Sequence, residues 1–204
     1  MTKSKLYKTL VFILRPIFKI IYRLEVKGID NIPKSNKAIL CPNHTSNADP
    51  ILLAISTPRQ IFFMAKQELF SNKILAKFFK TLGAFPVNRG KGDSSALEKA
   101  EEILKKDQLL GLFIEGTRSK TGEFLRPKTG AALIACNTKA DVIPIYIRCV
   151  DGVKVKPFKK NILIIGKPLT INDLNLESPS GKAFRDASRN IMNNIKNLRP
   201  NKSN

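Results

Sequence analysis

Tryptophan is absent from this chain of 204 residues, histidine occurs once and cysteine occurs three times. The cysteines, Cys41, Cys136 and Cys149, lie far apart and form no CxxC pair. This spacing argues against a cysteine-based metal site and against the disulfide framework of a small secreted domain. A chain of this length can bury a core without disulfides. We therefore expect three reduced thiols in the core of a cytosolic protein.

Long hydrophobic runs are also lacking, although the N-terminal segment is rich in apolar residues. In KLYKTLVFILRPIFKIIYRL (residues 5–24) the longest stretch between charges, residues 9–14, is far shorter than the ~20 residues that a membrane-spanning helix needs. A cleaved signal peptide is equally disfavoured, because charges interrupt the apolar region and no small-residue cleavage site follows.

The same segment nevertheless has a helical pattern. On a helical wheel one narrow stripe is basic and the rest of the surface is apolar; the stripe consists of Lys5, Lys8, Arg15, Lys19 and Arg23. This pattern is typical of a helix that lies in the membrane interface with its lysines reaching the head groups, and Pro16 should kink it. Packing against the protein's own core is the alternative. We predict a membrane-associating helix at residues 1–25 and a peripheral or monotopic location on the cytoplasmic face of the cell membrane.

Acidic residues are scarce, since 16 Asp and Glu stand against 36 Lys and Arg, a formal net charge of +20. A chain this basic is expected to seek polyanions: a nucleic acid, an anionic membrane surface or an acidic protein. A nucleic-acid-binding module is the non-catalytic alternative. The lack of tryptophan, the few tyrosines and the absence of a recognition motif count against it.

Strand-like and helix-like segments alternate beyond residue 25. Strands are expected at residues 38–42, 61–65, 84–89, 109–115, 141–150 and 161–166. Helices are expected at residues 50–56, 72–82, 93–106, 129–138 and 181–198, with Asp93 as an N-cap and Gly83 ending the second. The alternation predicts an α/β fold with a mixed, largely parallel sheet flanked by helices, in one domain over residues 26–204.

The only histidine, His44, follows the strand-like AILCP and precedes a helix. Ligands gather at the carboxyl ends of strands in open α/β sheets. The intervening TSNAD contains turn-forming residues, which can bring the Asp49 carboxylate within hydrogen-bond reach of the ring. That carboxylate would keep a proton on one ring nitrogen and leave the other free to accept one, as in a general base acting on a hydroxyl. The alternatives are an ordinary surface or core histidine and an Asp49 that caps the following helix.

A second polar loop, FIEGTRS (residues 113–119), follows the apolar LLGLF. It combines an acidic residue, a glycine that allows close backbone approach, a hydroxyl and a guanidinium, namely Glu115, Gly116, Thr117 and Arg118. Such a set suits an anion with adjacent hydroxyl groups, whereas a solvated loop arginine is the simpler reading of Arg118.

Four motifs resemble those of the glycerolipid acyltransferase family, specifically the 1-acyl-sn-glycerol-3-phosphate acyltransferases. They are N-H-x-S-x-x-D at Asn43–Asp49, G-x5-R at Gly83–Arg89, F-P-E-G-T-R-S at Phe113–Ser119 with Ile114 in place of proline, and V-I-P-[IV] at Val142–Ile145. Each motif is weak by itself, whereas four in this order and spacing are a strong signal. The resemblance extends over about residues 26–166.

The resemblance implies an O-acyltransferase of phospholipid biosynthesis. His44, oriented by Asp49, would deprotonate the free sn-2 hydroxyl of 1-acyl-sn-glycerol-3-phosphate (lysophosphatidate). The oxygen would attack an acyl thioester, either acyl-CoA or acyl-carrier protein, and give phosphatidic acid. The alternative within the family is another lysolipid or a glycerol phosphate as acceptor.

The resemblance also implies roles for the remaining polar residues. Basic groups would hold the acceptor phosphate: Arg118 is the first candidate, with Lys66 and Arg89 assisting unless they pair with surface acids. Glu115 and Gly116 would position the glycerol or the phosphate. We expect no metal and no organic cofactor. As partners we expect an anionic membrane surface and, where it is the acyl donor in place of acyl-CoA, an acyl-carrier protein, but no nucleic acid. An aromatic set is expected in the core or, alternatively, along an acyl-chain groove: Phe62, Phe63, Phe78 and Phe79.

Overall fold

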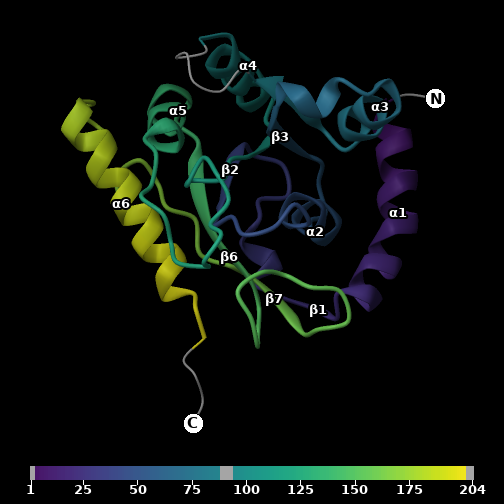
Figure 1. The fold of residues 1–204 in the computed structure, drawn as a ribbon. Coiled ribbons are helices and arrows are strands. Elements are labelled where there is room, and N and C mark those ends of the chain that lie inside the picture. The colour runs from purple at the N-terminus through teal and green to yellow at the C-terminus, as the bar shows by residue number, and fades with distance from the viewer. Residues whose placement is uncertain (1–2, 88–93, 201–204) are drawn as a thin grey trace.

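A computed structural model describes residues 3–87 and 94–200 of the chain, and in these residues a seven-stranded sheet forms the centre of the molecule (Figure 1). The strand order is β1-β7-β6-β2-β5-β3-β4. The strands are β1 (Leu24–Lys27), β2 (Ala38–Pro42), β3 (Ile61–Lys66), β4 (Ala84–Val87), β5 (Leu109–Gly111), β6 (Asp141–Cys149) and β7 (Asn161–Ile165).

Most neighbouring strands of this sheet run parallel. Parallel pairing joins β6 to β2, β2 to β5, β5 to β3 and β3 to β4. β6 and β7 are antiparallel, and β1 is parallel to β7. The expected α/β fold with a mixed, largely parallel sheet flanked by helices is therefore confirmed. Because β2, β5 and β3 are parallel neighbours, the loops that follow them meet at one edge of the sheet.

Helices cover both faces of the sheet (Figure 1). The helices are α1 (Lys3–Ile21), α2 (Asp49–Ser56), α3 (Lys73–Thr81), α4 (Ser94–Lys105), α5 (Gly130–Thr138) and α6 (Gly181–Asn197). Ile39 and Cys41 of β2 pack with α4, α5 and α6, whereas Ala38 and Leu40 pack with α1 and α2. A strand buried on both faces reads as an unbroken apolar run, which is why AILCP shows no alternation. All three cysteines are buried and free, as expected.

α1 lies against α2 and also contacts α3. The Tyr7 and Val11 side chains are buried, and the Arg15 guanidinium donates hydrogen bonds to the carbonyl oxygens of Ile55 and Thr57, at 2.7 Å and 2.8 Å. These carbonyls lie at the C-terminal end of α2, where helix carbonyl groups lack partners within the helix. Burial of Tyr7 raises its pKa to about 12. No helix among the described residues is long and apolar enough to cross a bilayer.

Several elements differ from the expected ones at their ends. Residues 24–27 form an edge strand that the sequence pattern does not predict, because LEVK is short and half charged. β5 ends at Gly111 rather than at residue 115; the chain leaves the strand there, although the Leu112 amide still donates to the Leu40 carbonyl at 2.9 Å. Gly83 follows α3 with a φ of 92°, a conformation that favours glycine. Asp93, the expected N-cap, lies outside the described residues.

Candidate functional site

The site lies at the carboxyl edge shared by β2, β5 and β3. His44 follows β2 by two residues, and Asp49 is the first residue of α2. A tight turn connects them, in which the Asp49 amide donates to the Ser46 carbonyl at 3.3 Å and the Ala48 amide donates to Ser46 Oγ at 3.2 Å. The turn-forming residues between strand and helix therefore fold the carboxylate back onto the histidine.

The imidazole and the carboxylate form a close pair. His44 Nδ1 lies 2.9 Å from Asp49 Oδ2, and the same oxygen accepts hydrogen bonds from the Thr45 and Ser46 amides, both at 2.7 Å. The Asp49 side chain is 1% exposed and the His44 side chain 13% exposed. The N-cap position of α2 belongs to Ala48, and no side chain caps the helix. Asp49 thus faces the histidine rather than capping the helix.

One face of the His44 imidazole stacks on the Phe113 ring. The centroids of the His44 and Phe113 rings lie 3.9 Å apart with an angle of 23° between the planes, and Phe113 lies 6.4 Å from Phe63 in turn. Phe113 comes from the loop after β5 and Phe63 from β3. Three neighbouring strands thus contribute to the position of one imidazole ring.

The backbone around His44 is held by two buried side chains. Asn43 Nδ2 donates to the Ile147 carbonyl at 3.0 Å, and the Ile147 amide donates back to Asn43 Oδ1 at 2.8 Å, so that the side chain extends the β2–β6 pairing. Glu115 Oε1 accepts from the His44 amide at 3.0 Å, and Oε2 accepts from the Leu125 amide at 2.9 Å. Burial raises the pKa of Glu115, and the two amide donors act in the opposite direction.

The Glu115 side chain binds the backbone of the protein, and its expected role in positioning the glycerol or the phosphate stays a prediction. The side chain is buried beneath the loop, and both carboxylate oxygens bind backbone amides of the protein. It does not line the cavity that is described next. Its neighbour Gly116 has a φ of 69°, and a side chain added there would meet Lys128 Cγ at 3.3 Å. Thr117 is exposed.

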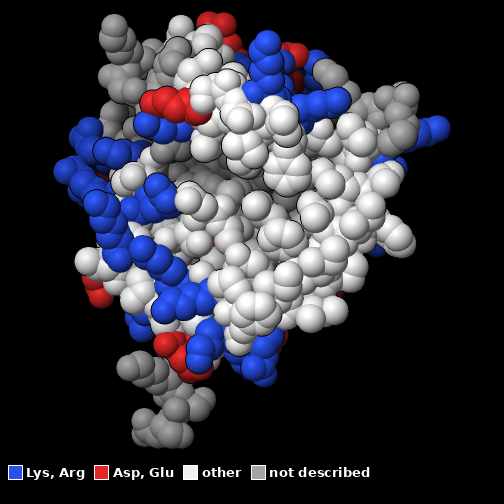
Figure 2. All heavy atoms as spheres, turned by 45° about the vertical axis from the view of Figure 1, so that its right-hand side comes forward, with Lys and Arg blue, Asp and Glu red and all other residues white. Residues whose placement is uncertain are grey.

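A cavity of about 400 Å³ opens beside His44. Besides His44, the polar lining residues are Asn47, Lys66 and Arg118, and the rest of the lining is apolar. The apolar lining consists of Pro50, Ile51, Ala54, Phe63, Met64, Ala65, Leu69, Phe79, Leu82, Ala84 and Phe113. Figure 2 shows the molecule hollowed on this side, with Lys and Arg gathered along one margin and uncharged surface along the other. This is the arrangement that an amphiphilic ligand with an anionic head would fit.

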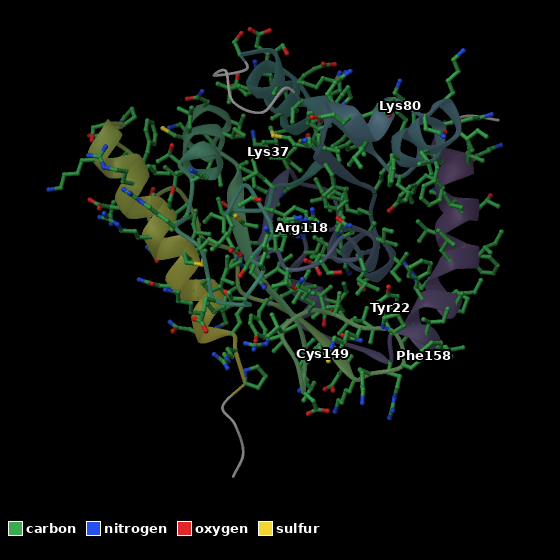
Figure 3. The ribbon with its side chains drawn as sticks, in the orientation of Figure 1. Tyr22, Lys37, Lys80, Arg118, Cys149 and Phe158 are labelled. Atoms are coloured by element: carbon green, nitrogen blue, oxygen red, sulfur yellow. The ribbon has the colours of Figure 1, made fainter. Side chains whose placement is uncertain are left out.

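The three basic candidates have different surroundings. Arg118 is exposed, lines the cavity and lies near the centre of the molecule in Figure 3. Lys66 also lines the cavity, but its Nζ lies 2.7 Å from Glu68 Oε1, so the expected alternative of a surface ion pair is present. Arg89 lies outside the described residues. Within the described parts of the chain, no three His, Cys, Asp or Glu side chains are grouped to hold a metal ion.

Some lining residues are not predicted by the motifs. Phe113 belongs to a motif, but no sequence signal shows that its ring lies against His44. Ile51 and Ala54 are three residues apart on α2 and so share the helix face directed at the cavity, a spacing that the sequence does contain. Phe63 and Phe79 line the cavity, which favours the groove alternative for these two aromatic residues.

Comparison with known proteins places the chain in a family. The sequence model of the family described as Acyltransferase matches residues 23–148. The chain is also 34% identical over 166 residues to the 1-acyl-sn-glycerol-3-phosphate acyltransferase of Bacillus subtilis (strain 168), an alignment that covers 80% of this chain and 82% of that protein. The chain belongs to the acyltransferase family. All four motifs of this acyltransferase, from Asn43 to Ile145, lie inside the matched region, and the resemblance that they suggest is confirmed.

A second relative supports the same assignment, and a crystal structure shows the same fold. The 1-acyl-sn-glycerol-3-phosphate acyltransferase of Streptococcus pneumoniae is 33% identical over 156 residues, which cover 74% of this acyltransferase and 58% of that protein. The crystal structure of the 1-acyl-sn-glycerophosphate acyltransferase PlsC from Thermotoga maritima has the same fold, with a TM-score of 0.73 at 24% sequence identity. That comparison covers 100% of this chain and 85% of the Thermotoga chain.

Proposed function

We propose that this acyltransferase transfers a fatty acyl group from a thioester to the free sn-2 hydroxyl of 1-acyl-sn-glycerol-3-phosphate, giving phosphatidic acid. One observation carries the proposal: His44, backed by Asp49 at 2.9 Å, lies on a mainly apolar cavity that also contains Arg118. The Bacillus and Streptococcus relatives are named as acyltransferases of 1-acyl-sn-glycerol-3-phosphate.

In the proposed reaction, His44 acts as the general base. Because Nδ1 faces the Asp49 carboxylate, the ring proton lies on Nδ1 and the Nε2 lone pair is free to accept the proton of the sn-2 hydroxyl. The hydroxyl oxygen attacks the thioester carbonyl carbon, the carbon–sulfur bond breaks, and the departing thiolate takes the proton from the imidazolium. His44 is thereby returned to its neutral form. The thioester is already activated, so the proposed reaction uses no metal and no organic cofactor.

The polar and apolar parts of the cavity would hold different parts of the substrates. The Arg118 guanidinium would bind the acceptor phosphate with paired charge-assisted hydrogen bonds, and Lys66 would add a second cation. Arg89 stays a candidate for the same task. Apolar side chains of the cavity, among them Phe63 and Phe79, would surround the acyl chain.

An assay of the purified full chain in detergent tests this function. The acyl donors are acyl-CoA and acyl-carrier protein, and the acceptors are lysophosphatidate, glycerol-3-phosphate and a neutral lysolipid, compared with the His44→Ala variant. We expect acylation of lysophosphatidate, with the variant losing more than 99% of turnover while its circular dichroism and melting temperature stay near those of the wild type. Preference for another acceptor would contradict the acceptor assignment, and an active His44→Ala variant would contradict the base.

We also propose that the exposed apolar side chains of α1 and α3 dock on the cytoplasmic face of an anionic membrane. Phe12 and Ile20 on α1 are 81% and 75% exposed, and Ile74 on α3 is similarly exposed. α1 contacts α3, and in Figure 2 the side of the molecule that carries them shows a broad uncharged surface. Leu69 is exposed next to α3 and also lines the cavity, so an acceptor lipid could enter directly from the bilayer.

Point substitutions test docking better than deletion of α1, because Tyr7 and Val11 belong to the core. Phe12→Ser/Ile20→Ser should weaken binding to vesicles of anionic phospholipid about 100-fold, since partial burial of each side chain contributes at least ~1.4 kcal/mol. Val150→Ser, another exposed apolar residue, serves as the control and should bind like the wild type. Equal flotation of all three proteins would contradict docking through α1.

A further inference from the structure

A second, strongly basic pocket lies apart from the cavity at His44. Its lining comes from the segment before α5 and from the N-terminal half of α6, namely Arg126, Pro127, Lys128, Thr129, Arg185 and Arg189. Four of these six residues are cationic, and the pocket has a volume of about 250 Å³. The reaction proposed above uses none of them.

Only one of the four cations of this pocket, Arg189, has a carboxylate partner among the described residues. Arg189 Nη1 lies 2.9 Å from Asp186 Oδ1, and both side chains are well exposed. Across residues 3–87 and 94–200, Arg126, Lys128 and Arg185 form no ion pair with a carboxylate. A concave site with surplus arginine suits a phosphate group, because a guanidinium binds two phosphate oxygens at once. Its volume is below the ~300–1,000 Å³ of sites that enclose whole ligands, so it fits one group of a larger molecule.

The pocket is attached directly to the loop of the candidate active site. The Leu125 amide donates to Glu115 Oε2 at 2.9 Å, and the Lys128 amide donates to the Ile114 carbonyl at 2.8 Å. Glu115 in turn accepts from the His44 amide. Residues 125–128 are therefore hydrogen-bonded to the loop whose Glu115 also binds the His44 amide, so the basic pocket and His44 adjoin the same loop.

The face of the sheet on which the pocket lies indicates which ligand would bind there. α5 and α6 cover the sheet face opposite α1, the helix with the exposed apolar side chains (Figure 1). A phosphate bound between residues 126–129 and α6 lies away from the proposed membrane side, which favours the water-soluble end of the donor over a lipid head group. A carrier protein would need a contact surface of ~800 Å² per partner rather than a small concave site.

We propose that the pocket of Arg126, Lys128, Arg185 and Arg189 binds a phosphate of the nucleotide part of a coenzyme A thioester, while the thioester lies at His44. This inference rests on the proposed function. It gives the acyltransferase a donor site that is separate from the acceptor phosphate site at Arg118.

Kinetics with two donors test the assignment on the full chain. Arg126→Gln/Arg185→Gln should raise the KM for acyl-CoA about 30-fold. The kcat, and all parameters for an acyl-pantetheine thioester that lacks the nucleotide, should stay unchanged. The control Lys167→Gln/Arg199→Gln removes two charges near the far end of α6, where Gly166 lies close to Leu198, and should behave as the wild type with both donors.

Titration calorimetry with adenosine 3′,5′-bisphosphate tests the pocket without turnover. The wild type and the control should bind it, and Arg126→Gln/Arg185→Gln should bind it at least about tenfold more weakly. Equal binding by all three proteins, an unchanged KM for acyl-CoA, or equal losses with both donors would overturn the donor site. A KM that rises only for acyl-carrier protein would overturn it in favour of an acidic protein partner. A wild type that turns over neither donor contradicts the proposed function, and the calorimetry still decides the pocket.

Discussion

Replacing Asp49 by asparagine separates the catalytic contribution of the carboxylate from its structural one. Asp49 Oδ2 lies within hydrogen-bond distance of His44 Nδ1 and of the Thr45 and Ser46 amides. An asparagine oxygen of the same size can accept the same bonds. The substitution therefore removes the negative charge and leaves the shape of the turn intact.

The two effects of the lost charge differ in size. An imidazolium about 4 Å from a carboxylate is stabilised by about 4 kcal/mol at an effective dielectric constant of 20. Loss of that interaction in the transition state corresponds to a kcat about 10³-fold lower. For the folded protein, weaker hydrogen bonds to a neutral acceptor cost about 1 kcal/mol each. Removal of a buried charge offsets this cost, because Asp49 Oδ1 is buried and has no hydrogen-bond partner among the described residues.

Glu115→Gln provides the matched control. This substitution also changes a buried carboxylate near His44 to a side-chain amide. The Glu115 side chain, however, contacts the backbone N–H of His44 and not its ring. One of its two amide donors loses its acceptor, so the unfolding free energy should fall by about 1–3 kcal/mol while kcat falls less than about tenfold. Acylation assays of both variants measure kcat, and urea titrations measure the unfolding free energy. A kcat of Asp49→Asn within tenfold of the wild type, or equal losses in both variants, would refute the reasoning.

Substitutions at three further positions test the surroundings of the His44–Asp49 pair. Arg118→Ala should raise the KM for lysophosphatidate about 10- to 100-fold with a smaller change for a neutral acceptor, because it removes charge-assisted hydrogen bonds to the phosphate; steady-state kinetics with both acceptors measure this, and an equal change would contradict it. Gly111→Ala should lower the unfolding free energy by about 1–3 kcal/mol in urea titrations, because the added Cβ would overlap the Phe63 ring. Asn43→Ala should cost about 2 kcal/mol and lower kcat, because the buried carbonyl and amide of Ile147 lose their partners; Asn43→Asp, which keeps one acceptor, should retain more stability.

The sequence predicts the His44–Asp49 pair because its geometry is local. Only four residues lie between His44 and Asp49, and the end of a strand, a turn and the start of a helix leave few ways to arrange the two side chains. The α/β sheet is predicted for a similar reason, since its buried strands form short apolar runs between helical segments. The edge strand at residues 24–27 is missed because its apolar and charged residues carry too little pattern.

The remaining features of the site depend on contacts between distant segments. Phe113 reaches His44 only because β5 pairs with β2, and the strand order cannot be read from local periodicity. Glu115 carries an acidic group in a polar loop, which suggests a ligand contact, whereas the structure uses it to hold the amides of His44 and Leu125. Side-chain roles of this kind follow from burial, and burial is set by the tertiary fold.

The short helix α2 connects the candidate catalytic pair to α1, the helix proposed to dock on the membrane. Asp49, the first residue of α2, lies beside the imidazole. At the other end of the helix, Arg15 of α1 donates hydrogen bonds to the carbonyls of Ile55 and Thr57. At 1.5 Å per residue, α2 is only about 12 Å long, and it is too short and too well packed to bend. If α1 docks on the membrane as proposed, the depth to which it enters the lipids would set the height of His44 above them, and binding to the membrane would align this residue with the next acceptor.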